Sequence, residues 1–147
     1  MNPESGGEMA PVFEAPTPET AYGGGPDLLT EAAAVHQALF ELTRSGRPGC
    51  LPPASKYERR EALLRAAAVT DRWALENGTE AAADRAVRAA QDFFSHDWDD
   101  DEQCAGPIGV HAPEWVAIGG TRAYTRQEYL AWYAGVACRT RTDPQEG

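Results

Sequence analysis

Two alanine-rich segments, separated by Asn77-Gly78, occupy residues 55–98 and constrain the fold more than any other feature of the sequence. In the first segment, apolar residues cover most of the circumference of a helix, and the S-x-x-E pattern from Ser55 to Glu58 is a capping box that marks its start. Gly78 can adopt the left-handed conformation that ends a helix, and Thr79 can cap the next one. Because a helix that is apolar on most sides needs neighbours on most sides, the two segments predict a central αα-hairpin.

Two charged residues, Arg60 and Asp71, interrupt the broad apolar surface of the first segment. They are too far apart along one helix to pair with each other. Each therefore needs another partner or access to solvent. For Asp71 we expect a structural hydrogen bond rather than a functional site.

An amphipathic segment precedes the hairpin. Asp27 is a suitable N-cap for a helix that runs to about Arg44, and its apolar positions repeat with helical spacing. The predicted core stripe consists of Leu28, Ala32, Val35, Leu39 and Leu42. A loop rich in Pro and Gly, at 47–54, then connects this helix to the central hairpin.

In the C-terminal third of the chain, the spacing of the apolar residues changes from a helical period to one typical of strands. Residues 115–118 and 121–124 flank Gly119-Gly120, a pattern typical of a β-hairpin with a two-residue turn, in which Trp115 would face Tyr124 across the strands. A second capping box, Thr125 to Glu128, would then start the last helix. The predicted fold is mainly α: a small helical bundle of about four helices with one C-terminal β-hairpin, at about 115–124, before the last helix.

The ends of the chain differ in composition from the body. Residues 1–26 are rich in Pro, Gly and Glu and contain no Lys or Arg, which predicts a disordered acidic tail. A single helical domain is expected over 27–138, followed by a frayed tail at 139–147. Because no signal peptide or long apolar run is found, we expect a cytoplasmic protein that has no membrane contact, with its cysteines as free thiols.

The formal net charge of −10 is concentrated in two places. Residues 1–26 contain four Glu, and the run from Asp97 to Glu102 contains five acidic residues, so the remainder of the chain is close to neutral. The simplest interpretation of these acidic stretches is solubility. Broad affinity for nucleic acid requires a basic surface, which this distribution does not predict.

The segment from His96 to Pro113 is the only one whose residues suggest metal chemistry. Asp97, Asp99 and Asp101 follow the opening of an EF-hand loop, but Glu102 and Ile108 occupy positions that need Gly and Glu. The spacing of His96, Cys104 and His111 fits no standard zinc site. We therefore predict no metal ligands, no cofactor and no catalytic residues.

Two segments, 59–65 (RREALLR) and 124–132 (YTRQEYLAW), together resemble small uncharacterised proteins of actinobacterial conjugative plasmids and phages. The resemblance spans roughly 28–132 and implies an accessory cytoplasmic factor of a mobile genetic element, with no catalytic residue. Separately, 118–122 (IGGTR) before a capped helix resembles the wing of an excisionase-type DNA binder. In those proteins a helix-turn-helix precedes the wing, whereas here an acidic loop occupies that position.

These observations favour a noncatalytic protein-interaction or regulatory accessory protein with an unidentified protein partner. If Val116 and Ile118 of the hairpin pack inward, Trp115, Tyr124 and Arg122 face outward, and these residue types dominate binding hot spots. The predicted partner-binding residues are Trp115, Arg122, Tyr124 and Arg126. In the competing interpretation, Trp115 belongs to the core and covers the end of the Phe93-Phe94 cluster.

Two other functions remain open at this stage. A DNA-binding accessory protein would use a wing-like hairpin around Arg122, although the local positive charge is small for several phosphate contacts. A small metal-dependent enzyme would use the loop from His96 to His111. We expect the chain not to be an enzyme.

Overall fold

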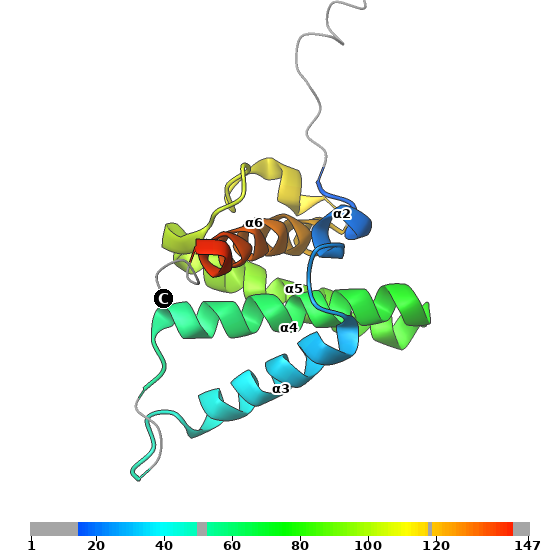
Figure 1. The fold of residues 1–147 in the computed structure, drawn as a ribbon. Coiled ribbons are helices and arrows are strands. Elements are labelled where there is room, and N and C mark those ends of the chain that lie inside the picture. The colour runs from blue at the N-terminus through cyan, green and yellow to red at the C-terminus, as the bar shows by residue number, and fades with distance from the viewer. Residues whose placement is uncertain (1–14, 50–52, 118, 143–147) are drawn as a thin grey trace, which may run out of the picture.

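The computed structural model describes residues 15–49, 53–117 and 119–142. Within these ranges the chain is all-helical (Figure 1). The elements, in chain order, are α2 (Pro18–Tyr22), α3 (Leu28–Arg44), α4 (Lys56–Asn77), α5 (Glu80–Asp99), the short 3-10 helices η1 (Asp101–Gln103) and η2 (Pro113–Val116), and α6 (Gly120–Thr142).

The predicted central hairpin is confirmed and consists of α4 and α5. The capping box is present, since Ser55 Oγ accepts the Glu58 N–H and the Glu58 side chain accepts the Ser55 N–H. Gly78 ends α4 with a φ of 68°, a left-handed conformation that favours glycine. Small residues allow the two helices to approach closely next to this turn, where Ala74 of α4 and Ala82 and Ala86 of α5 form a separate small cluster.

The main core lies where α4 and α5 meet α6 and α2. It is built largely from aromatic rings, and Phe93 of α5 packs against Tyr124 of α6 with ring centroids 5.7 Å apart. Its buried residues are Ala21, Tyr22, Leu64, Ala67, Ala68, Phe93, Val110, Trp115, Tyr124 and Tyr129. In Figure 1, α6 lies across α4 and α5 on one side, while α3 lies on the other.

The predicted β-hairpin at about 115–124 is wrong. No strand occurs in the described ranges, and Trp115 lies in η2 while Tyr124 lies in α6. The Gly pair forms a tight turn into a helix: Gly119 has a φ of 80°, and a Cβ at Gly120 would clash with the backbone of Trp115. The aromatic pair does form, with centroids 5.3 Å apart, but across this turn rather than between strands.

The second predicted capping box is also wrong, because α6 begins at Gly120 rather than after Thr125. Thr125 is fully buried inside the helix, where its hydroxyl donates to the carbonyl of Thr121. Glu128 faces the core instead of capping the helix. The backbone of α6 continues to Thr142, into the segment predicted to be frayed.

The described part of the acidic N-terminal segment, residues 15–26, is more ordered than its composition predicts. Residues 1–14 lie outside the described residues, but Thr17 caps α2, and α2 packs against α6. Tyr22 is buried, its ring contacts that of Tyr129 at 5.3 Å, and its hydroxyl donates to Asp71 at 2.6 Å. One aromatic side chain therefore anchors part of a segment that composition assigns to disorder.

Helix α3 begins as predicted, with the Asp27 carboxylate accepting the Thr30 N–H. The predicted apolar stripe of α3 is only partly buried. Val35 is buried, but Leu39 is 38% exposed. In Figure 1, α3 runs antiparallel to α4 and diverges from it towards the C-terminal end of α3. The apolar stripe therefore contacts α4 along only part of its length.

No helix among the described residues is long and apolar enough to cross a membrane.

Candidate functional site

Arg60 of α4 is at the centre of a buried ionic cluster. It donates through Nε and Nη2 to the two carboxylate oxygens of Asp97, at 2.8 and 2.7 Å, and through Nη2 to Glu128 Oε1 at 2.8 Å. The two carboxylates are fully buried, and the Arg60 side chain is 6% exposed. One cation thus holds two acidic side chains from α5 and α6 inside the core.

The remaining acceptor positions of the two carboxylates are occupied as well. Asp97 accepts the Tyr124 hydroxyl at 2.6 Å, and Glu128 accepts the backbone N–H groups of Ala105 and Gly106, both at 2.8 Å. Gln127 also donates to Glu128, at 3.0 Å. These bonds fix the segment after η1 onto α6 and compensate for the burial of the second negative charge.

The environment of this cluster shifts several pKa values. Burial favours the neutral form of Asp97, but the hydrogen bonds from Arg60 and Tyr124 outweigh it, so the pKa of this carboxyl is lowered. Burial raises the pKa of the Cys104 thiol to about 11, and burial together with the nearby carboxylates raises that of Tyr124. Asp97 is therefore charged at neutral pH, while the thiol and the phenol keep their protons.

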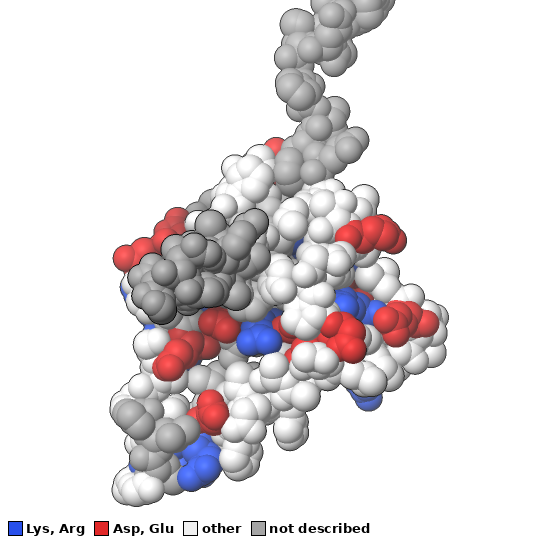
Figure 2. All heavy atoms as spheres, in the orientation of Figure 1, with Lys and Arg blue, Asp and Glu red and all other residues white. Residues whose placement is uncertain are grey.

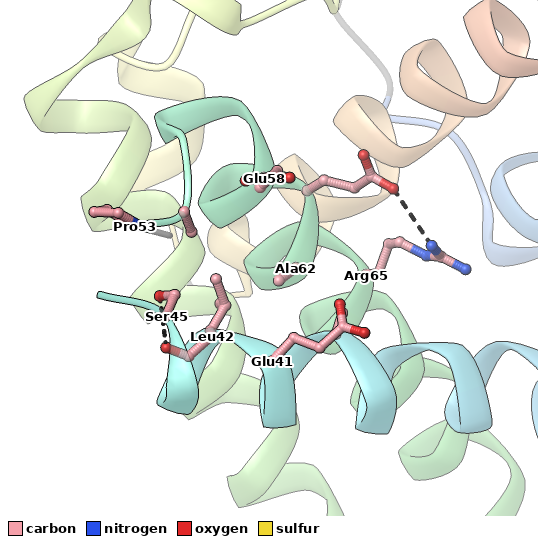
Figure 3. Close-up of a pocket in the computed structure, with 10 residues that line it drawn as sticks. Glu41, Leu42, Ser45, Pro53, Glu58, Ala62 and Arg65 are labelled. Carbon is pink, nitrogen blue, oxygen red and sulfur yellow. Dashed lines mark hydrogen bonds and ion pairs between the residues drawn. The ribbon is translucent and has the colours of Figure 1, made fainter. Parts of the chain in front are cut away.

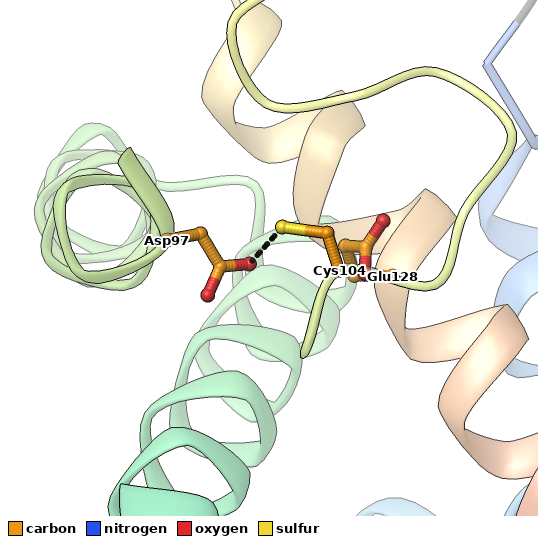
Figure 4. Close-up of side chains that lie close together, drawn as sticks. All are labelled: Asp97, Cys104 and Glu128. Atoms are coloured by element: carbon orange, nitrogen blue, oxygen red, sulfur yellow. Dashed lines mark hydrogen bonds between the residues drawn. The ribbon is translucent and has the colours of Figure 1, made fainter. Parts of the chain in front are cut away.

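Asp97, Cys104 and Glu128 form the only group of potential metal ligands that the described residues bring within 4.8 Å of one another (Figure 4). The group does not fit a metal ion. The Arg60 guanidinium already supplies the cation between the two carboxylates, and the Cys104 thiol, a ligand only when deprotonated, keeps its proton. We interpret the group as a structural ion cluster.

The histidines of the segment from His96 to Pro113 are not part of that group. His96 Nδ1 lies 3.4 Å from Asp97 Oδ1 at the edge of the cluster. His111 is exposed; its ring contacts Trp98 with centroids 4.3 Å apart, and its Nε2 lies 3.1 Å from the Trp98 carbonyl oxygen. His96 and His111 therefore have different structural partners.

A second ionic cluster surrounds Asp71. Arg126 donates to both of its oxygens, at 2.8 and 2.9 Å, Arg122 donates to Oδ1 at 2.6 Å, and the Tyr22 hydroxyl completes the set. The hydrogen bonds outweigh burial and lower the pKa of Asp71. The expected structural hydrogen bond of Asp71 is confirmed, and it joins α2, α4 and α6.

The four predicted partner-binding residues do not form an outward-facing surface. Trp115 is 3% exposed and donates from Nε1 to the Gly109 carbonyl, and Tyr124 is fully buried. Arg122 and Arg126 are half-buried and paired with Asp71. The competing interpretation, in which Trp115 belongs to the core, agrees with this placement.

A groove lies between α3 and α4, and it was not predicted from the sequence. It has a volume of about 500 Å³ and lies where the two helices diverge, and the end of the connecting loop lines it as well (Figure 3). Side chains from α3, including Leu42 and Glu41, line one wall, and Ala62 and Arg65 of α4 line the other. Its apolar lining residues are Ala38, Leu42, Pro53, Ala54 and Ala62.

An ion pair joins α3 to α4 next to the groove. Arg65 Nε donates to the fully buried Glu31 at 2.5 Å, Arg65 also pairs with Glu61 at 3.4 Å, and the Tyr129 hydroxyl donates to Glu31 at 3.3 Å. About one turn further along α3, Val35 is buried. Beyond Val35 the two helices diverge (Figure 1), and there Leu42 is half-buried and Leu39 is exposed.

Comparisons with protein-family models, curated proteins and solved structures find no match to the chain. The arrangement of the side chains is therefore the basis on which a function is proposed.

Proposed function

We propose that this chain is a noncatalytic protein-interaction protein, and that it binds its partner in the groove between α3 and α4. The groove is the observation that supports the proposal. Apolar residues of α3, at positions whose spacing is typical of a core stripe, are only partly covered by the residues that the structure describes. Helix-binding proteins commonly receive a partner in a groove of this kind.

The state of the buried polar groups supports the same proposal. The carboxylates of Asp71, Asp97 and Glu128 each accept several internal hydrogen bonds and face guanidinium groups. A general base or nucleophile needs an acceptor or a reactive atom that a substrate can reach. In the described part of the chain, these clusters are arranged to hold helices together rather than to act on a substrate.

Site-specific photocrosslinking tests the proposal. Benzoylphenylalanine replaces Leu42 in the groove, and in a matched variant it replaces Val87, a 37% exposed apolar residue of α5. Incubation with extract of the native host should give a discrete protein adduct from position 42 that position 87 does not give. Excess wild-type protein should suppress this adduct, whereas an excess of the Leu42→Glu variant should not.

Equal adducts from both positions, or suppression by Leu42→Glu as effective as by the wild type, would contradict binding in the groove. Thermal unfolding of each variant establishes that the comparison concerns folded proteins.

A further inference from the structure

We infer that the partner segment is a basic amphipathic helix, an inference that rests on the proposed function. The apolar face of this helix enters the groove between α3 and α4, and its Lys or Arg side chains contact the acidic rim of the groove. The inference concerns the chemistry of the partner and follows from the length, the lining and the charge of the groove.

The length of the groove matches a short stretch of helix. Glu31 of α3 pairs with Arg65 of α4 and the two helices run antiparallel (Figure 1), so Ala38 and Leu42 of α3 lie on the same side of this pair as Ala62 and Glu58 of α4. At about 1.5 Å per residue, the lining of each helix extends over roughly 10 Å, which is about two turns. Apolar side chains spaced three and four residues apart on a partner helix would therefore be the groups that enter.

The charge of the rim determines whether a basic or an acidic amphipathic helix fits the groove better. Three acidic residues, Glu41, Glu58 and Glu61, line the groove, and the only basic residue among its described lining is Arg65. That guanidinium is already paired with Glu31 and Glu61. Glu41 and Glu58 are exposed, and Asp and Glu side chains lie over α3 and α4 on the face shown in Figure 2. The rim thus presents net negative charge to an incoming segment.

The terminal segments of the chain itself do not match this rim. Residues 1–14 contain three Glu, residues 143–147 contain Asp143 and Glu146, and neither segment contains Lys or Arg. Their charge has the same sign as that of the groove. Charge complementarity therefore points to a segment of another protein.

Two designed peptides of about 18 residues test the inference, each with Leu at the apolar helical positions. One carries Lys on its polar face and the other carries Glu. By fluorescence anisotropy at low salt, the Lys peptide should bind with a Kd of about 10 μM and the Glu peptide at least about tenfold more weakly. Added salt should weaken binding of the Lys peptide, because exposed charges are screened.

A protein with a net charge of −10 can attract a basic peptide to any part of its surface, so matched charge reversals locate the site. The double variant Glu41→Lys, Glu61→Lys should raise the Kd of the Lys peptide about fivefold. The control Asp84→Lys, Asp92→Lys makes the same change of net charge at exposed positions of α5 and should have a clearly smaller effect. Leu42→Asp, which adds negative charge but removes an apolar contact, should also weaken binding.

Equal Kd values for the Lys and Glu peptides, or equal effects of the two charge-reversal pairs, would overturn the inference. A dimer in sedimentation velocity that Leu42→Asp dissolves would overturn it too, since a second copy would then fill the groove. If position 42 crosslinks to a partner but the Lys peptide does not bind, the proposed function stands and the basic helix is excluded. If both fail, the proposed function falls as well.

Discussion

Replacing Arg60 with Met tests whether the buried cluster holds α4, α5 and α6 together. The substitution keeps most of the side-chain volume and removes the one cation that faces the fully buried carboxylates of Asp97 and Glu128. Removing one partner of a buried ion pair costs about 3–5 kcal/mol. Because two carboxylates share this guanidinium, we expect a loss of about 4 kcal/mol, a large fraction of the stability of a domain of this size.

The loss should depend on pH in a defined direction. In the wild-type chain the pKa of Asp97 is lowered, so its contribution to stability is present above the ordinary carboxyl pKa and is lost as the pH falls through the folded-state value. Without Arg60, burial dominates and raises the pKa of Asp97, so that protonation relieves the penalty. The difference in unfolding free energy between wild type and variant should therefore become smaller as the pH is lowered from about 7 to about 4.

Urea unfolding followed by circular dichroism measures both effects. With an m value of about 2 kcal/mol/M, the unfolding midpoint of Arg60→Met should fall by about 2 M at pH 7. Arg59→Met is the matched control, because Arg59 is the exposed neighbour on the same helix. A loss for Arg60→Met below about 1 kcal/mol, or one that is constant across the pH range, would refute this account of the cluster.

Four further experiments test other contacts of the fold. Tyr22→Phe removes the hydroxyl that donates to Asp71 and should cost about 2 kcal/mol in urea unfolding, and deleting residues 1–26 should cost more, since the ring of Tyr22 is lost as well. Trp115→Ala should cost about 3–5 kcal/mol, as expected for a buried aromatic side chain; an unchanged midpoint would place Trp115 outside the core. In a Cys50→Ser, Cys138→Ser background, Cys104 should react with a disulfide reagent at pH 8 at least about tenfold more slowly in the folded protein than in urea, because its pKa is raised to about 11; equal rates would contradict its burial.

The helices that local signals specify could be predicted from the sequence. The capping box at Ser55, the left-handed Gly78 and the helical period of 55–98 agree with one another, and the α4–α5 hairpin has the predicted form. The N-cap of α3 at Asp27 was predictable for the same reason. In these elements the residues that define the structure are close together in the sequence.

The errors arise where contacts between distant residues decide the structure. Gly119-Gly120 is compatible with both a hairpin turn and a turn into a helix, and the burial of Tyr124 against α5 selects the helix. Asp97 belongs to an acidic run that suggests a solvated surface, yet it pairs with Arg60, 37 residues earlier. The unusual position of Arg60 on an apolar surface was a signal that such a partner exists, but it did not identify the partner.

The groove could not be predicted, because the sequence of α3 carries a regular apolar stripe that is typical of complete packing. The angle between α3 and α4 determines which part of that stripe is covered, and the Glu31–Arg65 pair joins the two helices before the α3 residues that line the groove. Neither the angle nor this pair, 34 residues apart, follows from local periodicity. The outward-facing placement predicted for Trp115 and Tyr124 differs from the structure for a related reason, since aromatic residues serve both cores and interfaces.

Chemical-shift mapping with the Lys-faced peptide tests the central claim most directly. Titrated into isotope-labelled protein, the peptide should shift the amide signals of Ala38, Leu42 and Ala62 at the groove, while those of Ala83 to Arg88 on α5 stay in place. Shifts concentrated at the acidic residues 97–102, with the groove signals unchanged, would show that the peptide recognises charge alone and would contradict the assignment of the α3–α4 groove as the partner site.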